Sequence, residues 1–166
     1  MGRFIDCGEL RETNGEGFLL AMKNGTLRGD ITVDGDMVKD GILNFPVKIK
    51  EVTGDFVCID KRLTSLKGAP EKVGGDFSCY DNKLTNLEGA PKEVGRNFYC
   101  FGNQLTNLEG APKEVGRNFY CSNNKLTSLE GAPQKVGGNF VCSNNTKRFT
   151  EEEVRAVCNV KGRVIV

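Results

Sequence analysis

The sequence predicts a mainly β solenoid, a fold in which similar turns of chain stack side by side in a row. The first observation behind this prediction is a near repetition. "RNFYCFGNQLTNLEGAPKEVG" at 96–116 is followed at once by "RNFYCSNNKLTSLEGAPQKVG", and only six of the 21 positions differ. The second observation is a column of cysteines that recur every 21 residues, namely Cys58, Cys79, Cys100, Cys121 and Cys142. A fixed period of about 20–50 residues is typical of solenoids, in which each unit packs only on its neighbours.

Composition excludes several classes of function. The chain has 166 residues, of which 38% are hydrophobic and 27% charged, as in one ordinary folded domain. It contains no His, which excludes Ser–His–Asp catalysis, Cys–His catalysis and His-ligated zinc. The net charge of +1 argues against a generic nucleic-acid binder. No apolar run is long enough to span a membrane and residues 1–20 hold four acidic residues, so we expect a cytoplasmic protein without membrane contact.

Residues 1–53 are predicted to form a β-rich N-terminal cap, because a solenoid must cover the hydrophobic end of its first turn. Turn or hairpin signals separate short β-prone runs at 17–22, 27–33 and 47–52. These signals are Asn14-Gly15, Asn24-Gly25 and Asp34-Gly35. In addition, "GDITVDGDMV" at 29–38 echoes "GDFVCIDKRL" at 54–63, which indicates a degenerate repeat or two within the cap.

Residues 54–145 carry the repeats, and every repeat has the same order of elements. Phe-x-Cys alternates with the period of a β-strand, so Phe and Cys are predicted to point inward from a short strand. Two leucines, a Gly-Ala-Pro and a valine follow. This stretch is too short and too rich in Gly and Pro for a stable α-helix, so we expect extended, turn or 3₁₀ structure on the outer side. One strand per turn, always in the same direction, predicts a single parallel sheet.

The repeat resembles the leucine-rich repeat, whose core reads L-x-x-L-x-L-x-x-N-x-L. Phe119, Cys121, Asn124 and Leu126 occupy the last four marked positions. The Asn recurs as Asn82, Asn103, Asn124 and Asn145. The resemblance implies that these side chains form a hydrogen-bonded ladder, with a looser edge at Lys61, where the first repeat departs from the pattern. The repeat length is most similar to that of bacterial effector and bacteriophage-encoded proteins, which implies the host cytoplasm if the chain is phage-encoded.

The cysteine column has three possible roles. A Cys at a Leu position can pack in the core as a small apolar residue. A disulfide ladder is a second possibility, but side chains on neighbouring parallel strands point the same way, which is poor disulfide geometry. A thiolate metal site is the third, although no Cys-x-x-Cys pair supports it. We therefore expect core packing, with no metal and no cofactor.

Residues 146–166 are predicted to close the other end as a short α-helix followed by a strand. Lys147 falls where a Leu is expected, so the repeat stops there. Thr150 and Glu153 match a capping box, which predicts a helix through about Cys158. The side chains expected to cover the last repeat are Val154, Val157 and Phe149. "GRVIV" at the end of the chain is expected to form the final strand.

Positions that vary between repeats indicate a binding face on the exposed side of the strands. The residue between Phe and Cys and the residue after Cys should both point away from the core. In the middle repeats these positions are aromatic, with arginines beside them. The predicted partner-binding residues are Tyr80, Arg96, Tyr99, Phe101, Arg117 and Tyr120. Tyr99 should lie beside Tyr120, and Tyr80 beside Phe101. Such residues are enriched at protein interfaces, although they also stabilise strand surfaces by stacking.

Acidic residues gather toward the first repeats. They are Asp55, Asp60, Asp76 and Asp81. Together with the central arginines they would give the face a charge gradient that orients a partner. An ordinary solvated edge explains them equally well.

The expected function is a non-catalytic protein-binding module that uses the concave strand face. The resemblance implies a bacterial or phage protein that inhibits or redirects a host or defence protein. The alternative is a nucleotide or single-stranded nucleic-acid binder, in which the aromatic rings stack on bases and the arginines contact phosphates. An enzyme is disfavoured, because only Cys7 and Cys158 lie outside the cysteine column and neither has a recognisable motif. The sequence leaves the oligomeric state open.

Overall fold

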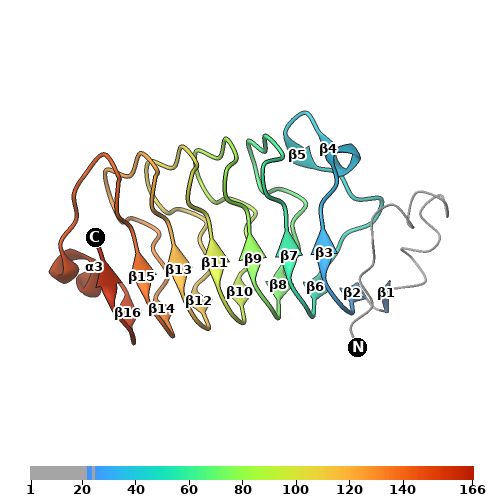
Figure 1. The fold of residues 1–166 in the computed structure, drawn as a ribbon. Helices are drawn as coiled ribbons and strands as arrows, with labels where there is room; N and C mark the ends of the chain where they lie inside the picture. The colour runs from blue at the N-terminus through green and yellow to red at the C-terminus, as the bar shows by residue number, and fades with distance from the viewer. Residues whose placement is uncertain (1–21, 24) are drawn as a thin grey trace.

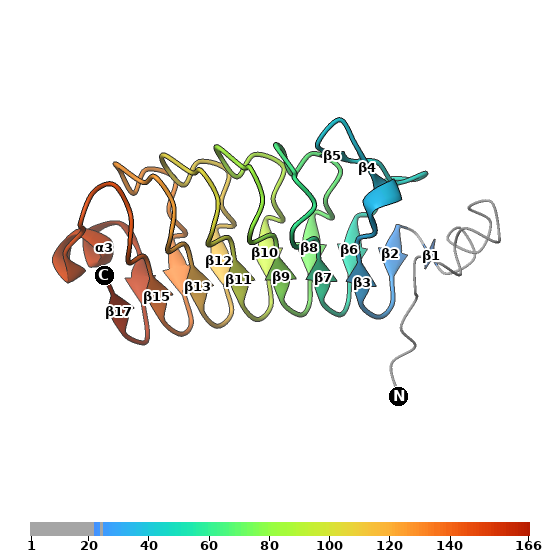
Figure 2. The same cartoon turned by 45° about the horizontal axis from the view of Figure 1, so that its top comes forward.

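The computed structural model describes residues 22–23 and 25–166, which form a β-solenoid, as predicted. Its turns lie side by side along one axis, from a hairpin at the N-terminal end to the helix α3 (Glu151–Val157) at the other (Figure 1). Each turn contributes two-residue strands to two sheets, in which the strands of successive turns run parallel. The irregular segments that connect the strands form a row of loops along the edge of the solenoid away from the sheets (Figure 2).

Two sheets run the length of the solenoid. Sheet A has seven strands, which are β3 (Ile31–Thr32), β7 (Phe56–Val57), β9 (Phe77–Ser78), β11 (Phe98–Tyr99), β13 (Phe119–Tyr120), β15 (Phe140–Val141) and β17 (Val164–Ile165). Sheet B has eight strands, which are β1 (Met22–Lys23), β2 (Thr26–Leu27), β6 (Glu51–Val52), β8 (Lys72–Val73), β10 (Glu93–Val94), β12 (Glu114–Val115), β14 (Lys135–Val136) and β16 (Asn159–Val160). Neighbouring repeats pair 21 residues apart, so each position forms a column along the axis.

The prediction of one strand per turn is wrong, because every turn makes a second strand at the valine column. Val94 and its equivalents point into the core while the preceding residue points outward, which is the alternation of a strand. The glycine that follows turns the chain from sheet B into sheet A. A Cβ atom at Gly95 would collide with the carbonyl oxygen of Gly74, so the close approach of the turns at this corner requires glycine.

The core consists of the columns that the repeat pattern predicted. The Phe, Cys, Leu and Val side chains of the repeats are buried, and neighbouring Phe rings lie 5.1–5.4 Å apart between centroids. Because each ring contacts the ring of the next turn, the column is one continuous apolar stack. The segment from the first Leu to the Pro contains turns and no α-helix, as its Gly and Pro content predicted.

The predicted asparagine ladder is confirmed, and we call Asn82, Asn103, Asn124 and Asn145 the buried Asn ladder. The Nδ2 group of Asn103 donates to the carbonyl oxygens of Cys79 and Cys100, at 3.0 and 3.2 Å. Its Oδ1 atom accepts a hydrogen bond from the backbone N–H of Leu84 at 3.0 Å. Each side chain therefore uses both its donor and its acceptor to join two turns. At the first repeat, where Lys61 replaces Asn, only the Lys61 backbone N–H takes part, donating to Asn82.

The described part of the N-terminal region continues the solenoid. Strands β1 and β2 pair in antiparallel fashion, and Gly25, the second residue of the predicted turn signal Asn24-Gly25, has a φ of +81°. The sequence echo at 29–38 is confirmed, because β3 pairs with β7 in the register that the echo implies, Ile31 with Phe56. The turn signal at Asn14-Gly15 lies outside the described residues.

A 3₁₀ helix and a small hairpin are inserted in this first turn. At Asp34-Gly35 the chain enters the 3₁₀ helix η1 (Gly35–Met37), with the Asp34 side chain as its N-cap. The hairpin follows, formed by β4 (Val38–Lys39) and β5 (Ile42–Leu43). Its turn residues Asp40 and Gly41 both have positive φ, which is the Asp-Gly turn chemistry that the sequence analysis overlooked.

The C-terminal cap matches its prediction in part. The capping box of Thr150 and Glu153 opens α3, and Phe149 and Val154 are buried against the last repeat. The expectation for Val157 is wrong, since its side chain is 49% exposed on the outer side of the helix. The chain then adds two strands where one was predicted, because 159–166 contributes one strand to sheet B and one to sheet A. None of the helices in the described segments is long and apolar enough to cross a membrane.

Candidate protein-binding face

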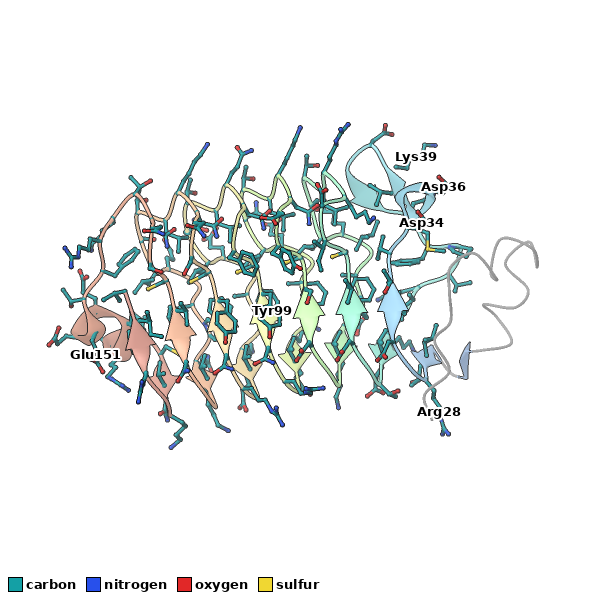
Figure 3. The ribbon with its side chains drawn as sticks, viewed as in Figure 1. Arg28, Asp34, Asp36, Lys39, Tyr99 and Glu151 are labelled. Atoms are coloured by element: carbon teal, nitrogen blue, oxygen red, sulfur yellow. The ribbon has the colours of Figure 1, made fainter. Side chains whose placement is uncertain are left out.

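Sheet A positions the predicted site residues on its outward side. Tyr99 and Tyr120 are the second residues of β11 and β13 and pair in register. Because Phe98 and Cys100 point into the core on either side of it, Tyr99 must point outward. Figure 3 shows Tyr99 over the middle of the sheet. Tyr80 and Phe101 directly follow the buried cysteines of their turns, so they extend the same outward face.

The four aromatic side chains form one cluster, as the sequence predicted. The rings of Tyr80 and Phe101 stack with centroids 4.4 Å apart, and those of Tyr99 and Tyr120 stack at 4.9 Å. Tyr99 also meets Phe101 edge to face at 6.4 Å, which joins the two pairs. All four side chains are partly exposed. The aromatic cluster, defined as Tyr80, Tyr99, Phe101 and Tyr120, is therefore a preordered surface and not a set of independent rings.

Arg96 and Arg117 lie at the corner that leads into sheet A, one turn apart. The backbone N–H of Arg117 donates to the carbonyl oxygen of Arg96 at 2.8 Å, and both side chains are exposed. The equivalent position is Gly29, Gly54, Gly75, Gly138 and Gly162 in the other turns. Arginine thus replaces glycine in the two turns that place Tyr between Phe and Cys. We call the aromatic cluster together with these two arginines the central face.

The hydroxyl of Tyr99 lies in a charged and partly buried setting. Burial raises the pKa of Tyr99, and the nearby Asp76 carboxylate raises it further, while Arg96 lowers it in part. The phenol therefore stays protonated at neutral pH. As a neutral hydroxyl it can donate a hydrogen bond to a partner and accept one.

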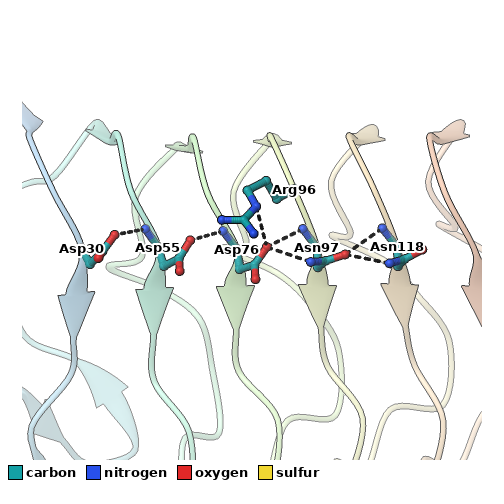
Figure 4. Close-up of polar contacts among 6 residues, drawn as sticks. All are labelled: Asp30, Asp55, Asp76, Arg96, Asn97 and Asn118. Carbon is teal, nitrogen blue, oxygen red and sulfur yellow. Dashed lines mark hydrogen bonds and ion pairs between the residues drawn. The ribbon is translucent and has the colours of Figure 1, made fainter. Parts of the chain in front are cut away.

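A second polar ladder, which the sequence analysis missed, runs along the corner beside the arginines. We call it the corner ladder, and its members are Asp30, Asp55, Asp76, Asn97, Asn118 and Asn139. Figure 4 shows the first five of them. In each case Oδ1 accepts a hydrogen bond from the backbone N–H of the next member, at 2.7–3.1 Å. Asn139 ends the series by accepting from the Arg163 N–H at 2.9 Å.

This ladder corrects the interpretation of two acidic residues. Asp55 and Asp76, predicted as part of an exposed charge gradient or solvated edge, are half-buried and bonded to the backbone of the next turn. The signal was present, because an Asp or Asn precedes the Phe in every repeat. Asp60 and Asp81 are exposed, as predicted, and both have positive φ in the turn after the strand.

Sheet B offers a second candidate surface, a shallow groove across β8, β10 and β12. Its charged lining residues are Lys72, Lys92, Glu93, Lys113 and Glu114. The two signs are mixed, and Lys72 bridges Glu51 and Glu93 at 3.8 and 3.6 Å. Because this surface is charge-balanced and lacks aromatic side chains, it presents fewer of the residue types that dominate interfaces.

The cysteine column packs in the core, as expected, and the six cysteines in the described part of the chain are free thiols. Burial raises the pKa of the Cys58, Cys79 and Cys100 thiols far above the ordinary range. Cys158 is buried beside α3, and burial raises its pKa to about 11. A raised pKa is the opposite of what an activated nucleophile requires. Cys142 differs, because a hydrogen bond with Cys121 lowers its pKa, but its side chain is buried in the core. Cys7 lies outside the described residues.

Comparison with models of known protein families, with curated proteins and with solved structures found no match to this chain. The geometry supports a repeat solenoid with turns of 21 residues. The resemblance to leucine-rich repeats and to phage or bacterial proteins stays a prediction from the sequence.

Proposed function

We propose that the chain is a non-catalytic module that binds another protein through the central face of sheet A. The observation that carries the proposal is a coincidence within the repeats. The two turns in which Arg replaces Gly are the same two in which the outward residue of the strand is Tyr. The backbone of these turns has the same pairing as the others, so the fold does not require either change.

The central face has the properties of an interface hot spot. Tyr and Arg are the residue types that most often dominate binding energy, because they combine a large apolar surface with hydrogen-bonding groups. The stacked rings are held by their neighbours before a partner arrives, so little side-chain entropy is lost on binding. Binding of a protein surface requires no catalytic group, and burial raises the pKa of the Cys58, Cys79 and Cys100 thiols away from that of an activated nucleophile.

A nucleotide or single-stranded nucleic-acid ligand is the second candidate, favoured by the neighbouring arginines. Base recognition by stacking requires free ring faces. Tyr99 and Tyr120 cover one face of each other, as do Tyr80 and Phe101. The face therefore presents ring edges and hydroxyl groups more than open ring faces, which suits a protein surface better than bases.

The finer role, that of a bacterial or phage protein that inhibits or redirects a host or defence protein, rests on the resemblance of the repeat alone. A tagged pull-down from bacterial lysate, read by mass spectrometry, addresses the partner and this role together. The matching variant replaces three residues by those that the chain uses in other turns: Tyr99→Val as in Val57, Phe101→Ser as in Ser122, and Tyr120→Val as in Val141. We call it the central-face variant.

The control changes sheet B by the same principle, with Lys92→Gln and Lys113→Gln, which copy Gln134 at the equivalent position of the next repeat. We expect a partner captured by the wild type and the control but lost with the central-face variant, while circular dichroism shows all three folded. Equal capture by a folded central-face variant would mean that the rings only stabilise the sheet.

A further inference from the structure

Arg96 and Arg117 occupy equivalent positions but differ in their electrostatic partners. Each continues the same backbone hydrogen-bond pattern, with Arg96 donating to Gly75 at 3.1 Å and Arg117 to Arg96 at 2.8 Å. The Nε atom of Arg96 lies 3.7 Å from the Asp76 carboxylate (Figure 4). None of the carboxylates in 22–23 and 25–166 forms an ion pair with Arg117.

The corner ladder explains this difference. Asp76 belongs to the turn before Arg96, and the member in the turn before Arg117 is Asn97. The ladder changes from carboxylates to amides at this step, and the amide carries no charge to neutralise Arg117. The Oδ1 atom of Asn97 is already engaged, since it accepts from the backbone and side chain of Asn118 at 3.1 and 2.9 Å.

An unpaired guanidinium beside a partly buried aromatic cluster is a site for an anionic group. Its planar set of N–H donors matches a carboxylate, with which it can form two parallel hydrogen bonds. Arg117 lies three residues before Tyr120 in the same turn, and the equivalent Arg96 is close enough to Tyr99 to lower the pKa of its phenol. A carboxylate bound to Arg117 would therefore lie near the stacked tyrosines.

We infer that the partner contacts the central face with an acidic segment, in which an Asp or Glu carboxylate pairs with Arg117 and an apolar neighbour packs on Tyr99 and Tyr120. This inference rests on the proposed function and adds the chemistry of the partner. Arg96 contributes less, because Asp76 already neutralises it. The corner ladder thereby sets which arginine is available to the partner.

Two substitutions in the corner ladder test the inference without changing the central face. Asn97→Asp gives Arg117 the carboxylate that Arg96 already has, and the consecutive Asp55 and Asp76 show that the ladder accommodates such neighbours. Asp76→Asn frees Arg96 and reproduces the Asn97–Asn118 step. Asn139→Asp makes the same chemical change as Asn97→Asp, but two turns away from Arg117's ladder partner, and serves as the matched control.

The probes are short fluorescent peptides in which Phe alternates with Glu or, in the neutral analogue, with Gln. Binding to the full chain is measured by fluorescence anisotropy at low and at physiological salt. We expect the Glu peptide to bind more tightly than the Gln peptide. Asn97→Asp should weaken its binding by about two- to fivefold, the range of an exposed ion pair, and Asp76→Asn should tighten it by a similar factor. Asn139→Asp should leave it unchanged.

Several results would overturn the inference. If the Glu and Gln peptides bind equally, or if the two ladder variants do not differ, Arg117 does not select a carboxylate. In that case, if the central-face variant binds neither peptide, the central face is still the binding site and the proposed function stands. If neither peptide binds the wild type, the result counts against both. Tighter binding of oligothymidylate than of the Glu peptide would favour a nucleic-acid ligand instead.

Discussion

The two polar ladders of this solenoid both join neighbouring turns by hydrogen bonds, but they differ in the donors and acceptors that their side chains must supply. In the buried Asn ladder, the Asn103 side chain donates to two backbone carbonyl oxygens and accepts from a backbone N–H. In the corner ladder, the only bond to the backbone is the one that Oδ1 accepts. The first ladder is Asn in each of its four members, whereas the second changes from Asp to Asn halfway along.

The difference shows where the sequence of a repeat is free to vary. A position that needs both a donor and an acceptor favours an amide over a carboxylate, which can only accept. A position that needs only an acceptor admits either an amide or a carboxylate, so its charge can differ between turns without loss of the backbone hydrogen bond. The corner ladder borders the central face, and its charge decides whether the neighbouring arginine is paired or available.

The substitution Asn103→Asp in the buried Asn ladder should have the largest effect on stability. It replaces a donor by a second acceptor and points a buried carboxylate at the carbonyl oxygens of Cys79 and Cys100. We expect the free energy of unfolding to fall by about 3 kcal/mol or more, measured by urea denaturation at neutral pH. A loss no larger than that of Asn97→Asp would show that the buried ladder does not depend on its donors.

Asn97→Ala in the corner ladder should have an intermediate effect. It leaves the half-buried N–H of Asn118 without its side-chain acceptor and removes the bond from Nδ2 to Asp76 at 3.0 Å. We expect a loss of about 1–2 kcal/mol in the same urea experiment. A loss equal to that of Asn103→Asp would contradict the distinction between the two ladders.

Asp76→Asn should have the smallest effect on stability. The amide still accepts from Asn97 and can donate to Asp55, as Asn97 donates to Asp76. The change removes one half-exposed ion pair with Arg96, so the free energy of unfolding should change by less than about 1 kcal/mol. A larger destabilisation would mean that the carboxylate itself, and not only its acceptor role, holds the corner.

The repeat pattern predicted most of the fold because its columns follow from local chemistry. The inward Phe and Cys and the aromatic pairs follow from strand alternation at a constant period, whereas the buried Asn ladder was predicted from the resemblance to the leucine-rich repeat. The strand at the valine column was missed, because two residues are too few to show an alternation of their own. Asp40-Gly41 was missed because it lies inside an insertion that interrupts the period.

The charges of the central face were harder to predict. Asp55 and Asp76 look like surface residues in the sequence, and only their contacts with the next turn reveal the corner ladder. For the same reason, nothing in the sequence indicates that, among the residues the structure describes, Arg96 has a carboxylate partner and Arg117 has none. That distinction depends on residues 20 positions apart that stacking brings together.

The assignment of the central face as the binding site is tested most directly with a partner that is recovered by the pull-down and purified. Its affinity for the wild type, the central-face variant and the sheet B control is measured by isothermal titration calorimetry. Because hot-spot side chains often contribute about 2 kcal/mol or more each, we predict at least about a thirtyfold loss with the central-face variant and none with the control. Unchanged affinity in a folded central-face variant would contradict the assignment of this face as the binding site.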